Sequence, residues 1–271
     1  MDILYAIILG LVQGLTEFLP VSSSGHLLLM QKIMGLAEET NLFTTVMLHV
    51  GTLAAVIIVY RKRIWEMLSH PVKQSKYWLW LILATGVTAV IGFALKFVLR
   101  DESGSLDTKL LGFCFIITAI LLLVCNLVRK KYEASVTVPT MKWYHAAFIG
   151  VMQGLGTLCG VSRSGATITG AVCCKMKKED SAEFSFLLSI PAIVGGALLE
   201  ILDVVKTGAA GSINWLPTVI GMLTAGRVGY FAVKFMIKLI TKHSFMGFTI
   251  YTALLGIFVI FDQYVFKLIN W

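Results

Sequence analysis

Side chains that can transfer protons or bind phosphate are concentrated in two short segments of an otherwise apolar chain. Residues 10–25 (GLVQGLTEFLPVSSSG) contain Glu17 and are followed by His26, whereas residues 150–165 (GVMQGLGTLCGVSRSG) contain Arg163. The segments lie 140 residues apart and align without a gap, and 8 of the 16 aligned positions are identical. A duplicated segment whose acid, base and cation are divided between its two copies predicts one composite site.

The first segment has the residues for acid–base chemistry. Gln13 and Glu17 are four residues apart and therefore share one face of a helix. The turn that follows, PVSSSGH, ends that helix and begins another, for which Ser24 is a candidate N-cap. The turn thus offers backbone N–H groups and the hydroxyls of Ser22 and Ser23 to the same site.

The second segment has the residues for anion binding. Its turn, GVSRSGAT, contains Ser162, Arg163, Ser164, Gly165 and Thr167. A guanidinium offers planar bidentate donors and helix N-termini carry partial positive charge, so two such turns facing one another favour phosphate over other anions. Packing and helix capping are an equal alternative for the serines and glycines of both turns.

Charges inside a membrane require a reason. A charged side chain near the bilayer centre costs about 2.5–3.5 kcal/mol on insertion scales, so we expect Glu17 and Arg163 to serve a function. The alternative is a purely structural salt bridge between these two residues. His49, a lone histidine in an apolar stretch, is expected to pack between helices. Arg227 is expected to face water, a lipid phosphate or a carboxylate in segment 200–203.

The elements that position the two segments must be membrane helices. The chain has 271 residues, of which 57% are hydrophobic and 14% charged, with a mean hydropathy of +0.83. A soluble domain could not bury so much apolar surface. We therefore expect an all-α polytopic membrane protein with one membrane domain over residues 1–271. A helix rises about 1.5 Å per residue and the hydrocarbon core is about 30 Å thick, and six apolar stretches are long enough to cross it. The expected spans are residues 43–60, 78–98, 110–128, 184–202, 216–240 and 245–266.

The distribution of charge predicts the topology. Basic loops at 61–76 and 129–142 are expected in the cytoplasm by the positive-inside rule, and the acidic loop at 101–107 is expected outside. Each duplicated segment then consists of two apolar pieces that are too short to span, which predicts a re-entrant helical hairpin. Three spans separate the hairpins, so the two halves, about 1–131 and 142–271, are expected to form an inverted repeat whose hairpin tips meet near the midplane.

Composition excludes several other classes. The five cysteines have neither metal-ligand spacing nor a disulfide pattern, so we expect them to pack as thiols. The net charge of +8 comes largely from short basic loops, which favour anionic lipid headgroups and require no nucleic acid. The first ten residues lack the basic n-region of a cleavable signal peptide, so we expect the first segment to stay in the mature protein.

The two turns together resemble the signature of a known family. GLVQGLTEFLPVSSSGH and GVSRSGATITG are similar to the motifs of the undecaprenyl-diphosphate phosphatase family, the integral-membrane type associated with bacitracin resistance. Its signature pairs an [E/Q]xxxE helix, here Gln13 and Glu17, with a later PGxSRSxxT turn, and the similarity in length and hydropathy covers the whole chain. Two positions depart from the pattern: Cys159 replaces the proline, and Gln13 takes the amide option where many members have a second carboxylate.

The resemblance implies hydrolysis of undecaprenyl diphosphate to undecaprenyl phosphate and inorganic phosphate, which recycles the lipid carrier of peptidoglycan synthesis. Glu17, Ser23, His26 and Arg163 are the catalytic residues expected from it. Arg163 would bind the diphosphate and stabilise developing charge, while Glu17 or His26 would take a proton. The nucleophile is left open between Ser23, His26 and water. The expected substrate-binding residues are Gln13, Ser22, Ser24, Ser162, Ser164, Gly165 and Thr167.

The resemblance also implies a location and partners. We expect a multi-pass protein of the bacterial cell membrane with its site on the outer side. The expected partners are the polyprenyl diphosphate, bilayer lipids and, as an alternative to a monomer, a second copy in a homodimer. No tightly bound cofactor is expected. Mg²⁺ or Ca²⁺ is expected to arrive with the substrate, because Glu17, the one candidate ligand, makes a poor permanent metal site beside an amide.

Two other functions are compatible with six spans. An inverted repeat with broken helices is typical of secondary transporters, and a polyprenyl-phosphate flippase would need a similar anion site. His26 and Glu17 beside three serines favour chemistry, because transport of an anion needs no proton-transfer group there. A purely structural membrane subunit would explain the spans but not the polar turns.

Overall fold

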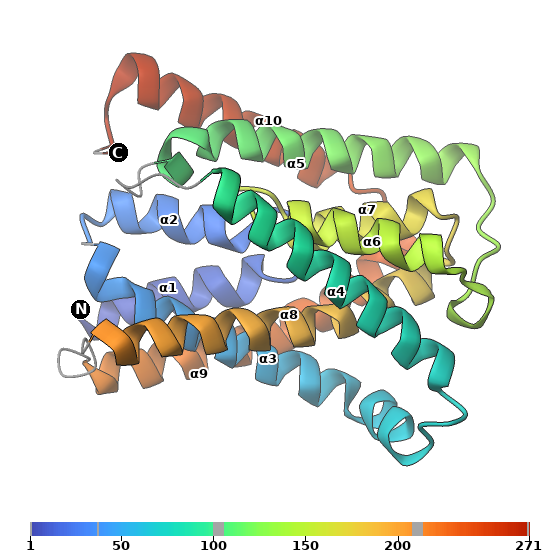
Figure 1. Cartoon of the computed structure of the whole chain (residues 1–271). Coiled ribbons are helices and arrows are strands. Elements are labelled where there is room, and N and C mark those ends of the chain that lie inside the picture. Colours follow the sequence, from blue (N-terminus) through green and yellow to red (C-terminus); the bar gives the residue numbers. More distant parts are fainter. Residues whose placement is uncertain (1, 37, 100–105, 208–213, 270) are drawn as a thin grey trace.

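Helices dominate the described part of the chain, and short turns and loops join them (Figure 1). The computed structural model describes residues 2–36, 38–99, 106–207, 214–269 and 271. A short 3-10 turn, η1 (Val138–Thr140), and a π-helical turn, η3 (Asp262–Phe266), accompany the longer helices. The ten α-helices of the described ranges are α1 (Ile3–Thr16), α2 (Ser23–Ile33), α3 (Glu38–Ser69), α4 (Ser75–Val98), α5 (Leu106–Lys131), α6 (Trp143–Leu155), α7 (Arg163–Cys173), α8 (Lys178–Thr207), α9 (Trp215–Lys242) and α10 (Met246–Phe261).

Six of these helices are long and apolar enough to cross a membrane, which confirms the six predicted spans of a multi-pass membrane protein. In lipid every backbone N–H and C=O must be satisfied within the segment, so a long apolar stretch folds as a helix. The spans are α3, α4, α5, α8, α9 and α10. They differ from the predicted ranges mainly at their ends: α3 continues to Ser69, past residue 60, and α8 begins at Lys178 rather than at 184.

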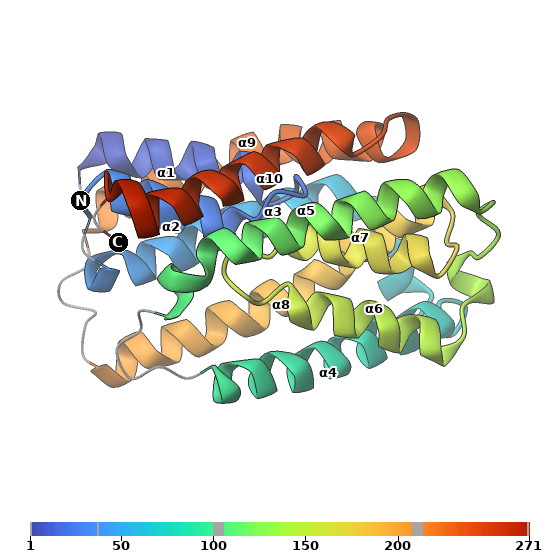
Figure 2. The same cartoon turned by 90° about the horizontal axis from the view of Figure 1, so that it is seen from above.

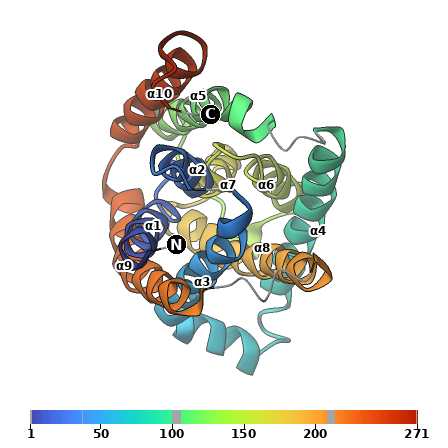
Figure 3. The ribbon, with the colours of Figure 1, turned by 90° about the vertical axis from the view of Figure 1, so that its left-hand side faces the viewer.

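Two pairs of short helices lie among the long ones. The pair α1 and α2 occupies the end of the bundle that carries both chain termini, and the pair α6 and α7 occupies the opposite end (Figures 1 and 2). Viewed along the bundle, α2 and α7 lie near its middle and α4, α9 and α10 lie at its periphery (Figure 3). The turns that join each pair meet inside the bundle, where the Ser164 hydroxyl donates to the Leu19 carbonyl oxygen at 3.1 Å.

Glycines let each short pair pack closely against a long helix. A Cβ atom added at Gly10 of α1 would lie 2.6 Å from the carbonyl oxygen of Gly221 on α9. The equivalent glycine of the second segment, Gly150 of α6, makes the same kind of contact with α4, where an added Cβ would lie 2.6 Å from the Ala84 carbonyl oxygen. Only a residue without a side chain allows backbones to approach this closely.

The main apolar core lies directly behind the first turn. Phe18 is 1% exposed and packs edge to face against Phe186 of α8, with ring centroids 5.9 Å apart. Side chains of α3, α5, α7 and α9 complete this cluster, among them Val56, Leu122 and Val233. Burial of Phe18 fixes the position of its neighbour Glu17, so the core determines where the carboxylate points.

Candidate functional site

The two turns begin their second helices with the same serine cap. The Ser22 hydroxyl accepts a hydrogen bond from the Gly25 N–H at 3.3 Å, and the Ser162 hydroxyl accepts one from the Gly165 N–H at 3.0 Å. The prediction that Ser24 caps the helix after the first turn is therefore wrong, because the N-cap of α2 is Ser22. The repeat could not have identified the cap, because Ser22 and Ser24 both have a serine, Ser162 or Ser164, at the equivalent position of the second segment.

The two caps differ in backbone conformation. Ser22 has φ 72° and ψ 98°, in the left-handed half of conformational space, whereas Ser162 has φ −73° and ψ 115°. A non-glycine residue rarely adopts a positive φ, and such strain is held only where surrounding contacts impose it. Ser22 is 2% exposed and lines the pocket described below. The strained residue thus lies in the turn that carries the carboxylate.

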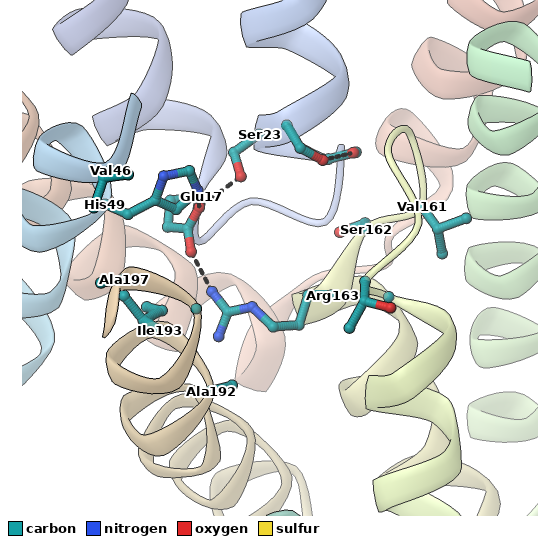
Figure 4. A pocket seen from close by; sticks show the side chains of 15 residues that line it. Glu17, Ser23, Val46, His49, Val161, Ser162, Arg163, Ala192, Ile193 and Ala197 are labelled. Atoms are coloured by element: carbon teal, nitrogen blue, oxygen red, sulfur yellow. Dashed lines mark hydrogen bonds and ion pairs between the residues drawn. The ribbon is translucent and has the colours of Figure 1, made fainter. Parts of the chain in front are cut away.

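Glu17 is the centre of a hydrogen-bond network that joins both turns (Figure 4). Its Oε2 atom accepts from the Ser23 hydroxyl at 2.5 Å and from Gln13 Nε2 at 2.9 Å. Its Oε1 atom forms an ion pair with Nη2 of Arg163, which comes from the other turn. Nε2 of His49 lies 3.7 Å from Oε2. Glu17 is 5% exposed, and a buried carboxylate is tolerated when its oxygens are paired in this way.

A pocket of about 220 Å³ opens beside this network. Its wall is formed by the ends of α1, α2 and α7 and by small or apolar residues of α3 and α8, such as Val46, Ala192 and Gly196. Six of the predicted site residues line it, and these are Glu17, Ser22, Ser23, Ser24, Ser162 and Arg163. The pocket therefore combines one carboxylate, one guanidinium and several hydroxyls with an apolar wall. That combination can bind a phosphate and remove a proton from a hydroxyl.

The other predicted residues of the two turns support the pocket from behind. Gln13 is fully buried, and its side chain donates to Glu17. The Thr167 hydroxyl lies 2.5 Å from the Ser185 hydroxyl of α8 and donates to the Arg163 carbonyl oxygen at 2.9 Å. A Cβ added at Gly165 would lie 3.3 Å from Cβ of Pro20 in the first turn. These contacts hold the turns together. That these residues bind the substrate directly stays a prediction.

His26 lies apart from the carboxylate. Its Nδ1 atom is 2.7 Å from the Ser22 carbonyl oxygen and its Nε2 atom is 2.7 Å from the hydroxyl of Tyr251 on α10. The imidazole also stacks on the Tyr251 ring, with centroids 5.7 Å apart, and meets the edge of Phe115 at 5.3 Å. Both ring nitrogens thus face groups other than Glu17. The catalytic role of His26 stays a prediction. Nothing in the sequence indicated that Tyr251 would contact it.

His49 lies in the pocket wall, where the sequence predicted only helix packing. Its Nδ1 atom is 2.8 Å from the Thr45 carbonyl oxygen one turn earlier in α3. A carbonyl only accepts, so Nδ1 carries a proton and Nε2 is the atom that faces Glu17. The available signal was its location, since an ionisable side chain within a span is a functional candidate by default.

Arg227 lies on α9 with its side chain exposed on the outer surface of the helix bundle. It does not line the pocket beside Glu17. The carboxylates considered for it, Glu200 and Asp203, have side chains outside the part of the chain that is described. An exposed position on a span fits the predicted contact with water or lipid phosphate.

Comparison with known proteins gives one consistent result. The family described as bacitracin resistance protein BacA matches residues 6–258. An undecaprenyl-diphosphatase of Carboxydothermus hydrogenoformans is 41% identical to this chain, covering 97% of this chain and 98% of the relative. Undecaprenyl-diphosphatase 4 of Bacillus thuringiensis is 40% identical over 97% of this chain and 98% of its own length. An undecaprenyl-diphosphatase of Halothermothrix orenii is 34% identical over 96% of this chain and 98% of its own length.

Proposed function

Because the chain belongs to the bacitracin resistance protein BacA family, we propose that it hydrolyses undecaprenyl diphosphate to undecaprenyl phosphate and inorganic phosphate. The activity named for relatives of nearly the same length supports this substrate. The observation that carries the proposal is the convergence of Ser23 and Arg163 on the two oxygens of Glu17 in one pocket. The product would return to peptidoglycan synthesis as its lipid carrier.

Ser23 is the nucleophile that the geometry favours. Its hydroxyl donates to Glu17 Oε2 at 2.5 Å, so the carboxylate can take the proton as the oxygen attacks the terminal phosphorus. The Oγ–P bond forms while the bond from phosphorus to the bridging oxygen breaks, and the electron pair of that bond leaves on undecaprenyl phosphate. The proton held by Glu17 leaves with undecaprenyl phosphate, so the carboxylate can next take a proton from the water that attacks the phosphorus of phosphoserine. The Oγ–P bond breaks as the bond from water to phosphorus forms, inorganic phosphate is released, and Glu17 returns the proton to Oγ of Ser23. The position of His26, beside Tyr251, supports neither direct attack nor proton transfer from Ser23.

Arg163 is proposed to hold the diphosphate. One of its nitrogens pairs with Glu17, and the side chain is 18% exposed at the pocket, so further N–H groups can reach phosphate oxygens. The N-terminal ends of α2 and α7 border the same pocket at Ser23 and Ser162. Partial positive charge at these two helix ends would stabilise the charge that builds on the transferred phosphoryl group.

The pocket does not fit a resident metal ion. Glu17 is the one carboxylate among the described residues that line it, and both of its oxygens already have partners. No group of three His, Cys, Asp or Glu side chains suited to a metal occurs in the described ranges of the chain. Mg²⁺ needs several oxygen ligands, so we propose that Mg²⁺ or Ca²⁺ enters bound to the diphosphate of the substrate.

We propose that the fold is an inverted repeat, with halves of about 1–131 and 142–271, and that each short helix pair is a re-entrant hairpin. Their entry from opposite ends of the bundle supports this (Figure 1). Equivalent glycines support it too, since Gly10 packs α1 on a long helix of the second half and Gly150 packs α6 on a long helix of the first half. Turns of non-helical backbone at this depth are tolerated because they border a polar pocket inside protein.

We propose that the protein lies in the bacterial cell membrane with its pocket open to the outer side. The basic loops 61–76 and 129–142 belong in the cytoplasm by the positive-inside rule, which leaves the end with α1, α2 and both termini outside. The long isoprenoid tail can remain in lipid while the diphosphate reaches the pocket from the interface. A homodimer stays a prediction. The family comparison does not favour the flippase alternative.

The experiment is phosphate release from undecaprenyl diphosphate by the purified protein in detergent. Wild-type protein is expected to release phosphate, and Ser23→Ala is expected to abolish release while retaining substrate binding. Ser69→Ala, at the exposed end of α3, is the matched control and should keep full activity. Near-normal turnover by Ser23→Ala would remove the serine mechanism. Lipid binding without phosphate release by the wild type would contradict the enzyme and favour transport.

A further inference from the structure

A second cavity is lined by residues between the end of α5 and the first turns of α6. This part of the chain lies at the end of the bundle away from both termini (Figure 1). It is an open hollow of about 810 Å³ rather than an enclosed pocket, and it shares no lining residue with the pocket beside Glu17. Its walls come from the connection between α5 and α6, the first turns of α6 and the end of α7. Lys142, His145 and Lys175 line it, and none of the described residues in its lining is acidic. The cavity is therefore suited to an anion.

The basic rim of this cavity is held in place by the backbone. Lys175 follows α7 with φ 58°, a left-handed conformation that a non-glycine residue rarely adopts. The N–H groups of Ser135 and Val136 both donate to the Lys175 carbonyl oxygen at 3.0 Å, and the Lys177 N–H donates to the Val136 carbonyl oxygen at 2.9 Å. Three hydrogen bonds to a strained turn indicate that surrounding structure imposes its conformation.

His145 adds a neutral donor to the two ammonium groups. The Lys142 backbone N–H donates to His145 Nδ1 at 3.3 Å, so the ring proton of the neutral imidazole is on Nε2. Partial burial and the adjacent Lys142 charge lower the pKa of His145, which favours this neutral form. The lining thus contains an N–H donor and two cations. The Lys175 ammonium lies 4.9 Å from the centre of the Tyr132 ring, and the Lys142 ammonium lies 5.9 Å from that of the Tyr144 ring.

An apolar wall continues the cavity toward the membrane. Phe148 lines it one helical turn beyond Tyr144 on α6 and is 42% exposed. Trp143 and Tyr144 at the start of the same helix are 66% and 46% exposed. Tryptophan and tyrosine gather at the level of lipid headgroups, so we expect the basic rim at headgroup level and Phe148 beside acyl chains.

We propose that this cavity binds an anionic phospholipid, with Lys142, His145 and Lys175 at the headgroup phosphate and an acyl chain against Phe148. A free phosphate ion would use the cations but would leave the exposed aromatic wall without a partner. The topology proposed above puts this end in the cytoplasmic leaflet, where anionic lipids attract basic residues. The binding itself does not depend on the proposed hydrolysis, so its failure and the failure of that activity are separate results.

The cavity contains its own reporters, because Cys173 and Cys174 line it. All five cysteines are thiols, as the sequence predicted. Burial, with a smaller effect of Cys173, raises the pKa of Cys174 to about 11, so labelling with N-ethylmaleimide should be done at alkaline pH. The rate at each cysteine is read by peptide mass spectrometry on protein in lipid nanodiscs of phosphatidylcholine, alone or mixed with phosphatidylglycerol.

Phosphatidylglycerol is expected to slow labelling of Cys173 and Cys174 in the wild type. The double variant Lys142→Gln/Lys175→Gln should lose this protection. A lysine near an anionic headgroup contributes about 1 kcal/mol, so removing two should weaken lipid binding roughly 30-fold. The matched control is Lys62→Gln/Lys73→Gln, which removes the same charge from an exposed position in the last part of α3 and from one between α3 and α4, and it should keep the protection.

Three results would overturn the proposal. Equal labelling rates with and without phosphatidylglycerol would show that the lipid does not occupy the cavity. Equal loss of protection in the control variant would show that only the net charge of this face matters. Inorganic phosphate is also added to protein in phosphatidylcholine nanodiscs. If it slows labelling of Cys173 and Cys174 as much as phosphatidylglycerol does in the mixed nanodiscs, the cavity is a site for phosphate and not for a lipid. Because all four substituted lysines are exposed, each variant is expected to fold, and gel filtration of the protein checks this.

Discussion

Arg163 and Glu17 form an ion pair in the pocket although 146 residues separate them in the chain. The pair uses only Oε1 of the carboxylate, and the other oxygen, Oε2, accepts from Ser23. The two edges of one carboxylate therefore face the anion-binding cation on one side and the serine hydroxyl on the other. The ion pair therefore does more than stabilise the fold, because the same contact orients the carboxylate toward Ser23.

Replacing Arg163 with lysine should separate its two contributions. Arg163→Lys keeps a positive charge beside Glu17, so the protein should fold, but it loses the planar fork that binds phosphate. Loss of one such donor costs about 10²–10³ in turnover, and we expect a fall in kcat of that size. Phosphate release from undecaprenyl diphosphate measures it, with Arg227→Lys on the exposed face of α9 as the control. Full activity of Arg163→Lys would remove the guanidinium from the mechanism.

His49 should matter for turnover although the sequence predicted only packing. Its Nε2 atom lies 3.7 Å from Glu17 Oε2 in the pocket wall, so His49→Leu would replace a polar neighbour of the carboxylate by an apolar one. We expect kcat to fall roughly tenfold, or about 1.4 kcal/mol, with a smaller fall for His49→Gln. His70→Leu, at an exposed position beyond α3, is the control. If His49→Leu turns over at the wild-type rate, this histidine has a packing part only.

The six spans and the contact between the two turns could be predicted from the sequence, because both depend on strong signals. Long apolar stretches must be helices in lipid, and the duplicated segment links Glu17 to Arg163 through their places in its two copies. The rotation of each span about its own axis had no such signal. His49 and Tyr251 lie on spans that are apolar on nearly every side, so their direction toward the pocket or toward His26 depends on packing between helices. The catalytic and binding roles of the site residues stay predictions.

The N-cap of α2 shows a second limit of sequence reasoning. Ser22, Ser23 and Ser24 are chemically identical candidates, and the position of the cap depends on which residue takes the positive φ. That residue is Ser22, and its conformation is imposed by contacts of the turn with the rest of the fold. Local propensity alone cannot distinguish three serines in a row.

The hydrogen bond between Tyr251 and His26 offers a test of the part of His26. Tyr251→Phe removes the hydroxyl that lies 2.7 Å from Nε2 and leaves the stacked ring in place. A hydrogen bond contributes about 1 kcal/mol, so phosphate release should fall roughly fivefold if His26 positions the turn for catalysis. Tyr264→Phe, at an exposed site after α10, is the control and should be neutral. Unchanged turnover in Tyr251→Phe would show that the hydrogen bond from Tyr251 to His26 does not position the turn for catalysis.

Close packing of α1 on α9 should make Gly10 sensitive to the smallest substitution. Gly10→Ala puts a Cβ atom 2.6 Å from the Gly221 carbonyl oxygen, and such overpacking typically costs about 1–3 kcal/mol. We expect a lower thermal unfolding temperature in detergent. Gly86→Ala on α4 is the control, because nothing lies within 4 Å of its added Cβ, and alanine is the better helix former by about 1 kcal/mol. Equal unfolding temperatures for the two variants would contradict the close approach.

The positive φ of Ser22 predicts an unusual order of stabilities. Ser22→Gly loses the hydroxyl cap, which costs only a few tenths of a kcal/mol for glycine, but relieves a left-handed conformation worth about 1–2 kcal/mol. Ser22→Ala loses the cap and keeps the strain, so it should be less stable by about 1 kcal/mol than the wild type. Thermal unfolding in detergent should therefore rank glycine above serine and serine above alanine. At Ser162, where φ is −73°, glycine should give no gain, and a gain of the same size there would show that strain at Ser22 is not the cause.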